Sequence, residues 1–283
     1  MTAPPAADAR GTEPEPGASP PAGAGPHTDY ETYLRIGDLL ELQVPLTPGA
    51  HDELLFIVIH QVYELWFKLL LHELGLARDE LLAGRAFAAV KPLRRVHEIE
   101  TLLLGQLSVL ATMSPDDFLT FRDPLAPASG FQSSQFREIE ALGGALDAAH
   151  ADAPLFSDAS RQRLRARLAQ PTLWDAFCSC LVASGLPMPA GAEGRARRLG
   201  SLAAVYRDRN TSAGHAALHE VAELLVDHDE AIAVWRFRHA AVAEREIGHR
   251  PGTGGSPGVA YLRTTVGRRF FPELWEVRSG ALT

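Results

Sequence analysis

A stretch of 32 residues without proline, Asp52–Ala83, limits the possible folds more than any other part of the sequence. It begins with two acidic residues, which suit the positive end of a helix dipole. A continuous helix of this length would extend about 48 Å at 1.5 Å per residue, enough for the central helix of a bundle. Four polar residues interrupt its most apolar part, Leu54–Leu71, so we expect a buried core helix and not a membrane span.

The rest of the chain from Asp29 onward also favours helices, and no alternating pattern is long enough to require a sheet. There is no internal repeat. The expected helices are 87–111 with a bend at Pro92, a short helix capped by Ser114, 133–150, 160–169, 172–184, 195–206, 213–226, 229–248 and 262–278. The sequence therefore predicts one all-α helical bundle domain over residues 28–283.

Residues 1–27 differ in composition from the rest. Eighteen of these 27 positions are Pro, Gly or Ala, so no apolar face can form and we expect a disordered extension. The segment lacks the basic start and apolar core of a secretory signal, and it has too little arginine for a transit peptide.

Charge and cysteine content exclude several classes of protein. The chain has 35 acidic residues against 27 Lys and Arg, a net charge of −8 without long single-sign blocks, which disfavours a nucleic-acid partner. The only two cysteines, Cys178 and Cys180, cannot build a disulfide scaffold, a zinc ribbon or a cysteine-ligated iron–sulfur cluster, and they suit a reducing cytoplasm. Eleven histidines remain as candidate metal ligands.

Two histidines follow an aromatic residue by four positions, which places each pair on one helical face. Phe56 and His60 lie in the apolar helix, where a histidine needs a partner or a ligand; a satisfied core histidine is the simpler interpretation of His60 alone. Trp235 and His239 form the second pair, in which an indole N–H can orient a metal-ligating ring. One such histidine is enough for a haem iron, although a surface histidine among arginines is the simpler interpretation of His239 alone.

Two further segments contain residues that could contact a ligand. Arg122 ends a short helix before the turn at Ser129, and its planar guanidinium suits a carboxylate, although a salt bridge or a C-cap would explain it more simply. The segment 250–258 places four glycines and two prolines around Thr253, which predicts unusual backbone dihedrals or a close approach to a ligand. It is neither a Rossmann fingerprint nor a Walker A loop.

A further pair, His215 and His219, has the spacing of two metal ligands on a helix. No glutamate lies between them, as a zinc hydrolase motif would require, so solvated helix positions are the default interpretation and a metal hydrolase is an alternative.

Taken together and in order, these segments resemble the tryptophan 2,3-dioxygenase family of helical haem enzymes. The resemblance extends from about residue 29 to the C-terminus. The matching segments are Tyr30–Leu34, His51–Gln61, Glu64–Trp66, Phe121-Arg122, Pro127–Ser133, Trp235–His239, Gly252–Ser256 and Phe270–Trp275.

The resemblance implies one haem b per subunit, with His239 as the axial ligand of the iron and Trp235 beside it. It also implies that His60 meets the indole N–H of the substrate next to an aromatic wall formed by Phe56. The implied reaction inserts both atoms of O₂ across the indole C2–C3 bond of L-tryptophan and gives N-formylkynurenine, the first step of tryptophan catabolism through kynurenine. The cysteine content, the charge balance and the interrupted apolar stretch predict a cytoplasmic protein with neither a nucleic-acid nor a membrane partner.

The same resemblance assigns the remaining contacts of the substrate. Arg122 would bind its carboxylate and Thr253 would lie near its ammonium group. Three aromatic residues and one serine complete the implied site: Phe118 and Ser129 line the pocket, and Tyr30 and Tyr33 reach into a neighbouring subunit of a homotetramer.

Two departures from the family pattern leave the substrate range open. Pro257 follows the glycine-rich run where relatives more often have a small polar residue, and Phe118 has no hydroxyl at a position that is sometimes tyrosine. The matching residues also do not separate this reaction from that of a relative, a haem monooxygenase of a substituted tryptophan in secondary metabolism. An alternative of a different class is a helical haem-binding or haem-sensing protein without turnover.

Overall fold

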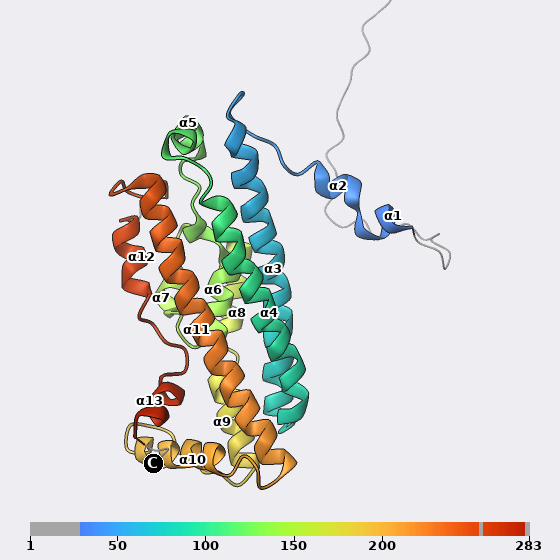
Figure 1. Ribbon diagram of the computed structural model, residues 1–283, viewed down its shortest axis with the longest axis vertical. Helices are drawn as coiled ribbons and strands as arrows, with labels where there is room; N and C mark the ends of the chain where they lie inside the picture. The colour runs from blue at the N-terminus through green and yellow to red at the C-terminus, as the bar shows by residue number, and fades with distance from the viewer. Residues whose placement is uncertain (1–28, 255–256, 281–283) are drawn as a thin grey trace, which may run out of the picture. The chain divides into compact units, whose positions relative to one another are not determined.

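A computed structural model of the chain describes residues 29–254 and 257–280 (Figure 1). The extension predicted at residues 1–27 lies outside these described residues. The chain divides into two compact units, residues 1–43 and 44–283, and each is described by itself.

The first unit contributes two short helices, α1 (Tyr30–Leu34) and α2 (Ile36–Leu40). Asp29 caps α1, because its carboxylate accepts a hydrogen bond of 2.8 Å from the backbone N–H of Thr32.

The second unit is helical and has no strand among the described residues, which confirms the predicted all-α class. One 3₁₀ turn, η1 (Gly130–Gln132), accompanies the α-helices. These are α3 (His51–Leu82), α4 (Ala86–Leu110), α5 (Pro115–Leu125), α6 (Ser134–Leu142), α7 (Ala148–Ala151), α8 (Asp158–Leu168), α9 (Leu173–Ala183), α10 (Arg195–Arg207), α11 (Ala213–Ile247), α12 (Val259–Thr265) and α13 (Pro272–Gly280).

Three long helices, α3, α4 and α11, form the main body of this unit and run side by side (Figure 1). Helix α4 packs against both α3 and α11, whereas α3 and α11 make little backbone contact with each other. Leucine is the most frequent residue of the core, and Leu70, Leu74 and Leu93 are almost completely buried. Side chains of α3 and α11 can therefore meet beside α4, although the backbones of these two helices are not in close contact.

Helix α3 is apolar on more than its buried face. Leu54 and Leu65 leave 48% and 52% of their surface exposed, so the expectation of a buried core helix is met on one face only. Among the described helices, α3 alone is long and apolar enough to cross a bilayer by length and composition, and its most apolar 18-residue window has a mean hydropathy of 1.6. The core helix of a soluble protein meets the same criterion.

Helix α11 is continuous, so the predicted division into 213–226 and 229–248 is wrong. Two of the polar residues near the expected break, His228 and Asp229, are buried and have tertiary partners. His228 lies 2.6 Å from Glu100 of α4, and Asp229 accepts hydrogen bonds from the backbone N–H groups of Phe270 and Phe271. Because both polar side chains bind groups outside α11, the helix continues through them.

The predicted helix 133–150 is instead two helices, and 262–278 is also divided, into α12 and α13. The first interruption is at Gly143 and Gly144. An added Cβ at Gly143 would lie 2.6 Å from the ring of Phe270, and Gly144 has a φ of +76°, which favours glycine. The C-terminal segment that carries Phe270 thus packs against the end of α6, where there is no room for a side chain.

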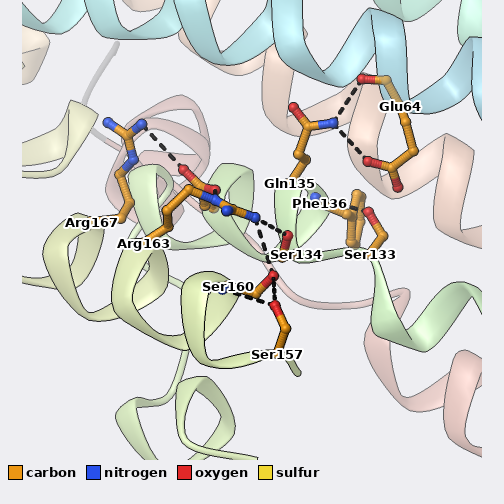
Figure 2. Close-up of polar contacts among 10 residues, drawn as sticks. Glu64, Ser133, Ser134, Gln135, Phe136, Ser157, Ser160, Arg163 and Arg167 are labelled. Atoms are coloured by element: carbon orange, nitrogen blue, oxygen red, sulfur yellow. Dashed lines mark hydrogen bonds and ion pairs between the residues drawn. The ribbon is translucent and has the colours of Figure 1, made fainter. Parts of the chain in front are cut away.

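Polar contacts hold the start of α6 in place (Figure 2). The Ser133 side chain accepts from the backbone N–H of Phe136, and Gln135 donates to both the side chain and the backbone carbonyl of Glu64 on α3. From α8, Arg163 donates to Ser134. This anchoring fixes the end of the preceding turn, which carries Ser129.

Candidate functional site

An aromatic wall connects α3 to α5 beside His60. The ring centroid of Phe56 lies 4.0 Å from that of His60 and 5.9 Å from that of Phe118. All three residues were predicted to belong to the site. The completely buried Phe121 contacts both Phe56 and Phe118 edge-on. The i, i+3 spacing of Phe118 and Phe121 was the sequence signal for this missed member of the wall.

His60 has a defined tautomer. Its Nδ1 lies 2.7 Å from the backbone carbonyl oxygen of Phe56, and because a carbonyl can only accept, Nδ1 carries the proton. Burial lowers the pKa of His60 below its ordinary value, more than the Phe56 carbonyl and Glu64 raise it. The ring is therefore neutral near pH 7, and Nε2 is free to accept a hydrogen bond.

Trp235 and His239 occupy one face of α11 as the spacing predicts. Their rings are stacked, with centroids 4.9 Å apart and 16° between the planes. The indole N–H, however, does not orient His239 through a hydrogen bond. It donates to the hydroxyl of Tyr63 on α3 at 3.3 Å, so the indole contacts the imidazole only through its face.

His239 has the properties of an available metal ligand. Burial lowers its pKa to about 4, and the nearby His60 adds a smaller effect in the same direction, so both rings are uncharged at neutral pH. Within residues 29–254 and 257–280, no hydrogen bond engages the imidazole of His239. A neutral imidazole on a helix, stacked on an indole and close to a second imidazole, fits axial ligation of a haem.

Arg122 lies on α5 one turn after Phe118. Its guanidinium donates to the carbonyl oxygen of Pro251 at 2.9 Å, and its approach to Asp123 is loose, at 3.7 Å. The side chain is 19% exposed, and its buried Nε has no partner among the described residues. Asp123 is 93% exposed, so the simple salt bridge accounts for little of this arrangement.

The segment around Thr253 packs on the turn that carries Ser129. The Thr253 hydroxyl donates to the carbonyl oxygen of Ala128, and an added Cβ at Gly254 would lie 2.7 Å from the Cβ of Ser129. Ser129 caps η1 by accepting from the backbone N–H of Phe131. Three predicted substrate residues, Arg122, Ser129 and Thr253, are thus joined through one loop.

Gly258, at the end of the glycine-rich segment, confirms the predicted unusual backbone dihedrals. This residue has a φ of +63°, and an added Cβ would lie 2.7 Å from the carbonyl oxygen of Arg250. Pro257, which departs from the family pattern, directly precedes this position.

Tyr30 and Tyr33 belong to the other compact unit. They are 72% and 76% exposed on α1, and neither is buried within that unit. Their predicted role in a neighbouring subunit remains a prediction.

The histidines of the alternative metal site have separate surroundings. His215 lies 3.0 Å from the Ser212 hydroxyl at the start of α11, His219 contacts the ring of Tyr206, and His228 is bonded to Glu100. Across the part of the chain that the structure describes, no group of three or more His, Cys, Asp or Glu side chains is arranged as a metal site.

A hollow of about 360 Å³ borders α11 and the C-terminal segment. Val234, Phe237 and Trp275 are among its lining residues, and it contains none of the predicted site residues. The predicted site residues of this unit instead come together from α3, α5, α11 and two loops.

Comparison with known proteins gives a consistent result. The family model of tryptophan 2,3-dioxygenase matches residues 19–172 and 194–280. A tryptophan 2,3-dioxygenase of a Nocardioides species is 48% identical over 261 residues, covering 90% of this chain and 95% of the relative. Those of Caulobacter vibrioides and Herpetosiphon aurantiacus are each 42% identical, covering 88% of this chain and 97% of theirs. The chain belongs to the tryptophan 2,3-dioxygenase family.

Proposed function

We propose that the protein is a haem-dependent dioxygenase that converts L-tryptophan and O₂ to N-formylkynurenine. The observation that carries the proposal is the pair of neutral imidazoles, His60 and His239, on two helices that flank α4. One can ligate an iron while the other retains a free acceptor nitrogen for the substrate. Family membership supports the same activity.

His239 would hold the haem b iron, with Trp235 stacked against its ring. A ferrous haem would supply the activation of O₂. Because both oxygen atoms enter the product, the reaction has no net electron input and requires neither a reductase nor a nicotinamide site. What the chain contributes is ligation, orientation of the substrate and exclusion of water.

His60 would position the indole. Since Nδ1 donates to the Phe56 carbonyl, the free Nε2 can accept the indole N–H of the substrate. We assign His60 a positioning role and not that of an obligatory base, because proton abstraction from an indole is poorly matched to the pKa of a histidine. The rings of Phe56 and Phe118 would line the apolar side of the pocket and exclude water.

The amino-acid end of the substrate would bind at the junction of α5 and the glycine-rich segment. Arg122 retains donors that its contact with Pro251 leaves free, and these suit a carboxylate. Thr253 donates its hydroxyl hydrogen to Ala128, so its oxygen can accept from an ammonium group. Ser129 would line the pocket between them. Fixing both ends of the substrate holds the reacting carbons in one orientation.

The proposal extends to assembly and location. A homotetramer in which Tyr30 and Tyr33 of one subunit complete a neighbouring site accounts for the exposure of both aromatic rings. The cysteine content suits the cytoplasm.

The test is to reconstitute the chain with haem, reduce it, and supply L-tryptophan with ¹⁸O-labelled O₂ while the product mass is measured. Two labelled oxygen atoms are expected in N-formylkynurenine. One labelled atom would show a monooxygenase reaction, and a Soret band without product would reject L-tryptophan as the substrate. Absence of haem from the reconstituted chain would overturn the proposed function and both haem-dependent alternatives.

A further inference from the structure

Tyr63 lies beside the site but has no role in the arrangement described so far. It follows His60 by three residues on α3, is buried to 7% exposure, and contacts both other long helices. Its hydroxyl donates to the carbonyl oxygen of Leu103 on α4 at 2.6 Å, and it receives the indole N–H of Trp235 on α11 at 3.3 Å. One hydroxyl group therefore joins the three helices that form the body of the bundle.

The direction of both hydrogen bonds follows from the groups involved. A backbone carbonyl can only accept, so the phenol O–H must point to Leu103. An indole N–H can only donate, so the phenol oxygen must accept from Trp235. Burial raises the pKa of Tyr63 to about 12, which keeps the phenol protonated at any physiological pH. Each of the two hydrogen bonds thus has only one possible direction.

This contact selects one orientation of the indole. A half-turn of the Trp235 ring would move its N–H away from the Tyr63 oxygen and leave the donor without a partner, which is costly for a group in the interior. Phe136 packs against the same indole at a centroid distance of 5.0 Å, and the Tyr63 ring contacts it edge-on at 6.1 Å. The indole is therefore held by a hydrogen bond and by two aromatic contacts.

The orientation of the indole is passed on to His239. The two rings are within 16° of parallel, so a rotation of the indole plane forces the imidazole to rotate or to lose its stacking. Groups that orient a ligating imidazole affect the strength and geometry of its bond to a metal. Among the described residues no hydrogen bond orients His239, and the ring that stacks on its imidazole is the indole of Trp235.

We infer that Tyr63 is a positioning residue that sets the orientation of His239 through Trp235. The inference rests on the proposed haem site, and it adds a link between the two sides of that site. Helix α3 carries His60, which faces the substrate, and three residues later the hydroxyl that orients the ligand on the opposite side. The orientation of the His239 imidazole then depends on a group of α3 as well as on its neighbours in α11.

The test compares four reconstituted proteins: the wild type, Tyr63→Phe, Trp235→Phe and the double variant. The resonance Raman band of the Fe–N(His) stretch and the haem reduction potential are measured in the ferrous and redox-poised proteins. Tyr63→Phe removes one oxygen atom and should keep haem content while shifting and broadening the Raman band. In the double variant, loss of the Tyr63 hydroxyl should add no shift beyond that of Trp235→Phe, because the indole donor is already gone.

Tyr206→Phe is the matched control. Tyr206 is also a buried tyrosine, but its hydroxyl bonds to Glu223 and Arg278, so it reports the cost of losing a buried hydroxyl away from His239. Its Raman band should be that of the wild type. An unchanged band in Tyr63→Phe would overturn the inference, as would a further shift in the Trp235→Phe background.

The double variant also covers the case in which Tyr63→Phe does not fold, because it contains no orphaned indole donor. Its comparison with Trp235→Phe then tests whether Tyr63 acts only through the indole, and any difference between their bands would overturn the inference. A wild-type chain that binds no haem would instead overturn the proposed function, so the two failures are distinguishable.

Discussion

The guanidinium of Arg122 and the carbonyl oxygen of Pro251 are joined by a 2.9 Å hydrogen bond between residues 129 positions apart. This bond holds the end of α5 against the loop that contains Thr253. The predicted carboxylate clamp and the predicted ammonium contact therefore depend on one another, although they lie in distant parts of the chain.

Arg122→Ala should weaken substrate binding on the order of 2–5 kcal/mol if the carboxylate pair is desolvated. Haem content should be unchanged. The measurement is the spectral titration of the reconstituted protein with L-tryptophan. Arg122→Lys is the matched variant, which keeps the charge but lacks the planar fork, and it should recover only part of the affinity. Equal affinity of Arg122→Ala and the wild type would reject the clamp.

Gly254→Ala should weaken binding of L-tryptophan, because the added Cβ would lie 2.7 Å from the Cβ of Ser129 and push the loop off its turn. Displacing packed groups by this amount costs about 1–3 kcal/mol. Gly267→Ala is the control, since an added Cβ there meets nothing within 4 Å. If both variants bound the substrate equally well, the close contact of loop and turn would have no part in the site.

His239→Gly should abolish haem incorporation while the helix content by circular dichroism stays near that of the wild type. The imidazole has a stacking contact but no hydrogen bond among the described residues, so its loss removes a ligand more than a structural support. Free imidazole should restore a Soret band by occupying the vacated space. His219→Gly, on the same helix, is the control and should bind haem normally. Normal haem content in His239→Gly would show that another residue ligates the iron.

Stability should decrease as the pH rises above about 4.5, because of the buried Glu100. Burial raises its pKa above the ordinary value of 4.5; His228 and His97 oppose this increase and Asp227 adds to it. Above pH 4.5 the unfolded chain releases this proton while the folded chain retains it, so the free energy of unfolding falls until the pH passes the folded-state pKa.

The measurement for Glu100 is urea unfolding at a series of pH values. Glu100→Gln should remove this part of the pH dependence, while Glu98→Gln, which changes an exposed glutamate on the same helix, should leave it in place. Identical pH profiles for Glu100→Gln and the wild type would contradict the assignment.

The local pattern of apolar and polar residues was sufficient to predict much of the fold. The length of α3 and the placing of Phe56 with His60, and of Trp235 with His239, follow from helical periodicity, which depends on the sequence within a few turns. Helix ends were less predictable. The polar pair His228 and Asp229 looks like an interruption of α11 in the sequence, yet both residues are buried against partners that lie more than 40 residues away.

The sequence by itself determined the all-α class, the aromatic–histidine pairs and, by resemblance, the family. Only the tertiary structure decided which groups meet: Trp235 with Tyr63 across 172 residues, Thr253 with Ala128 across 125, and Arg122 with Pro251. The physical reason is that a helix fixes the face on which a side chain lies, whereas the partner of each donor and acceptor depends on which helices and loops pack against that face.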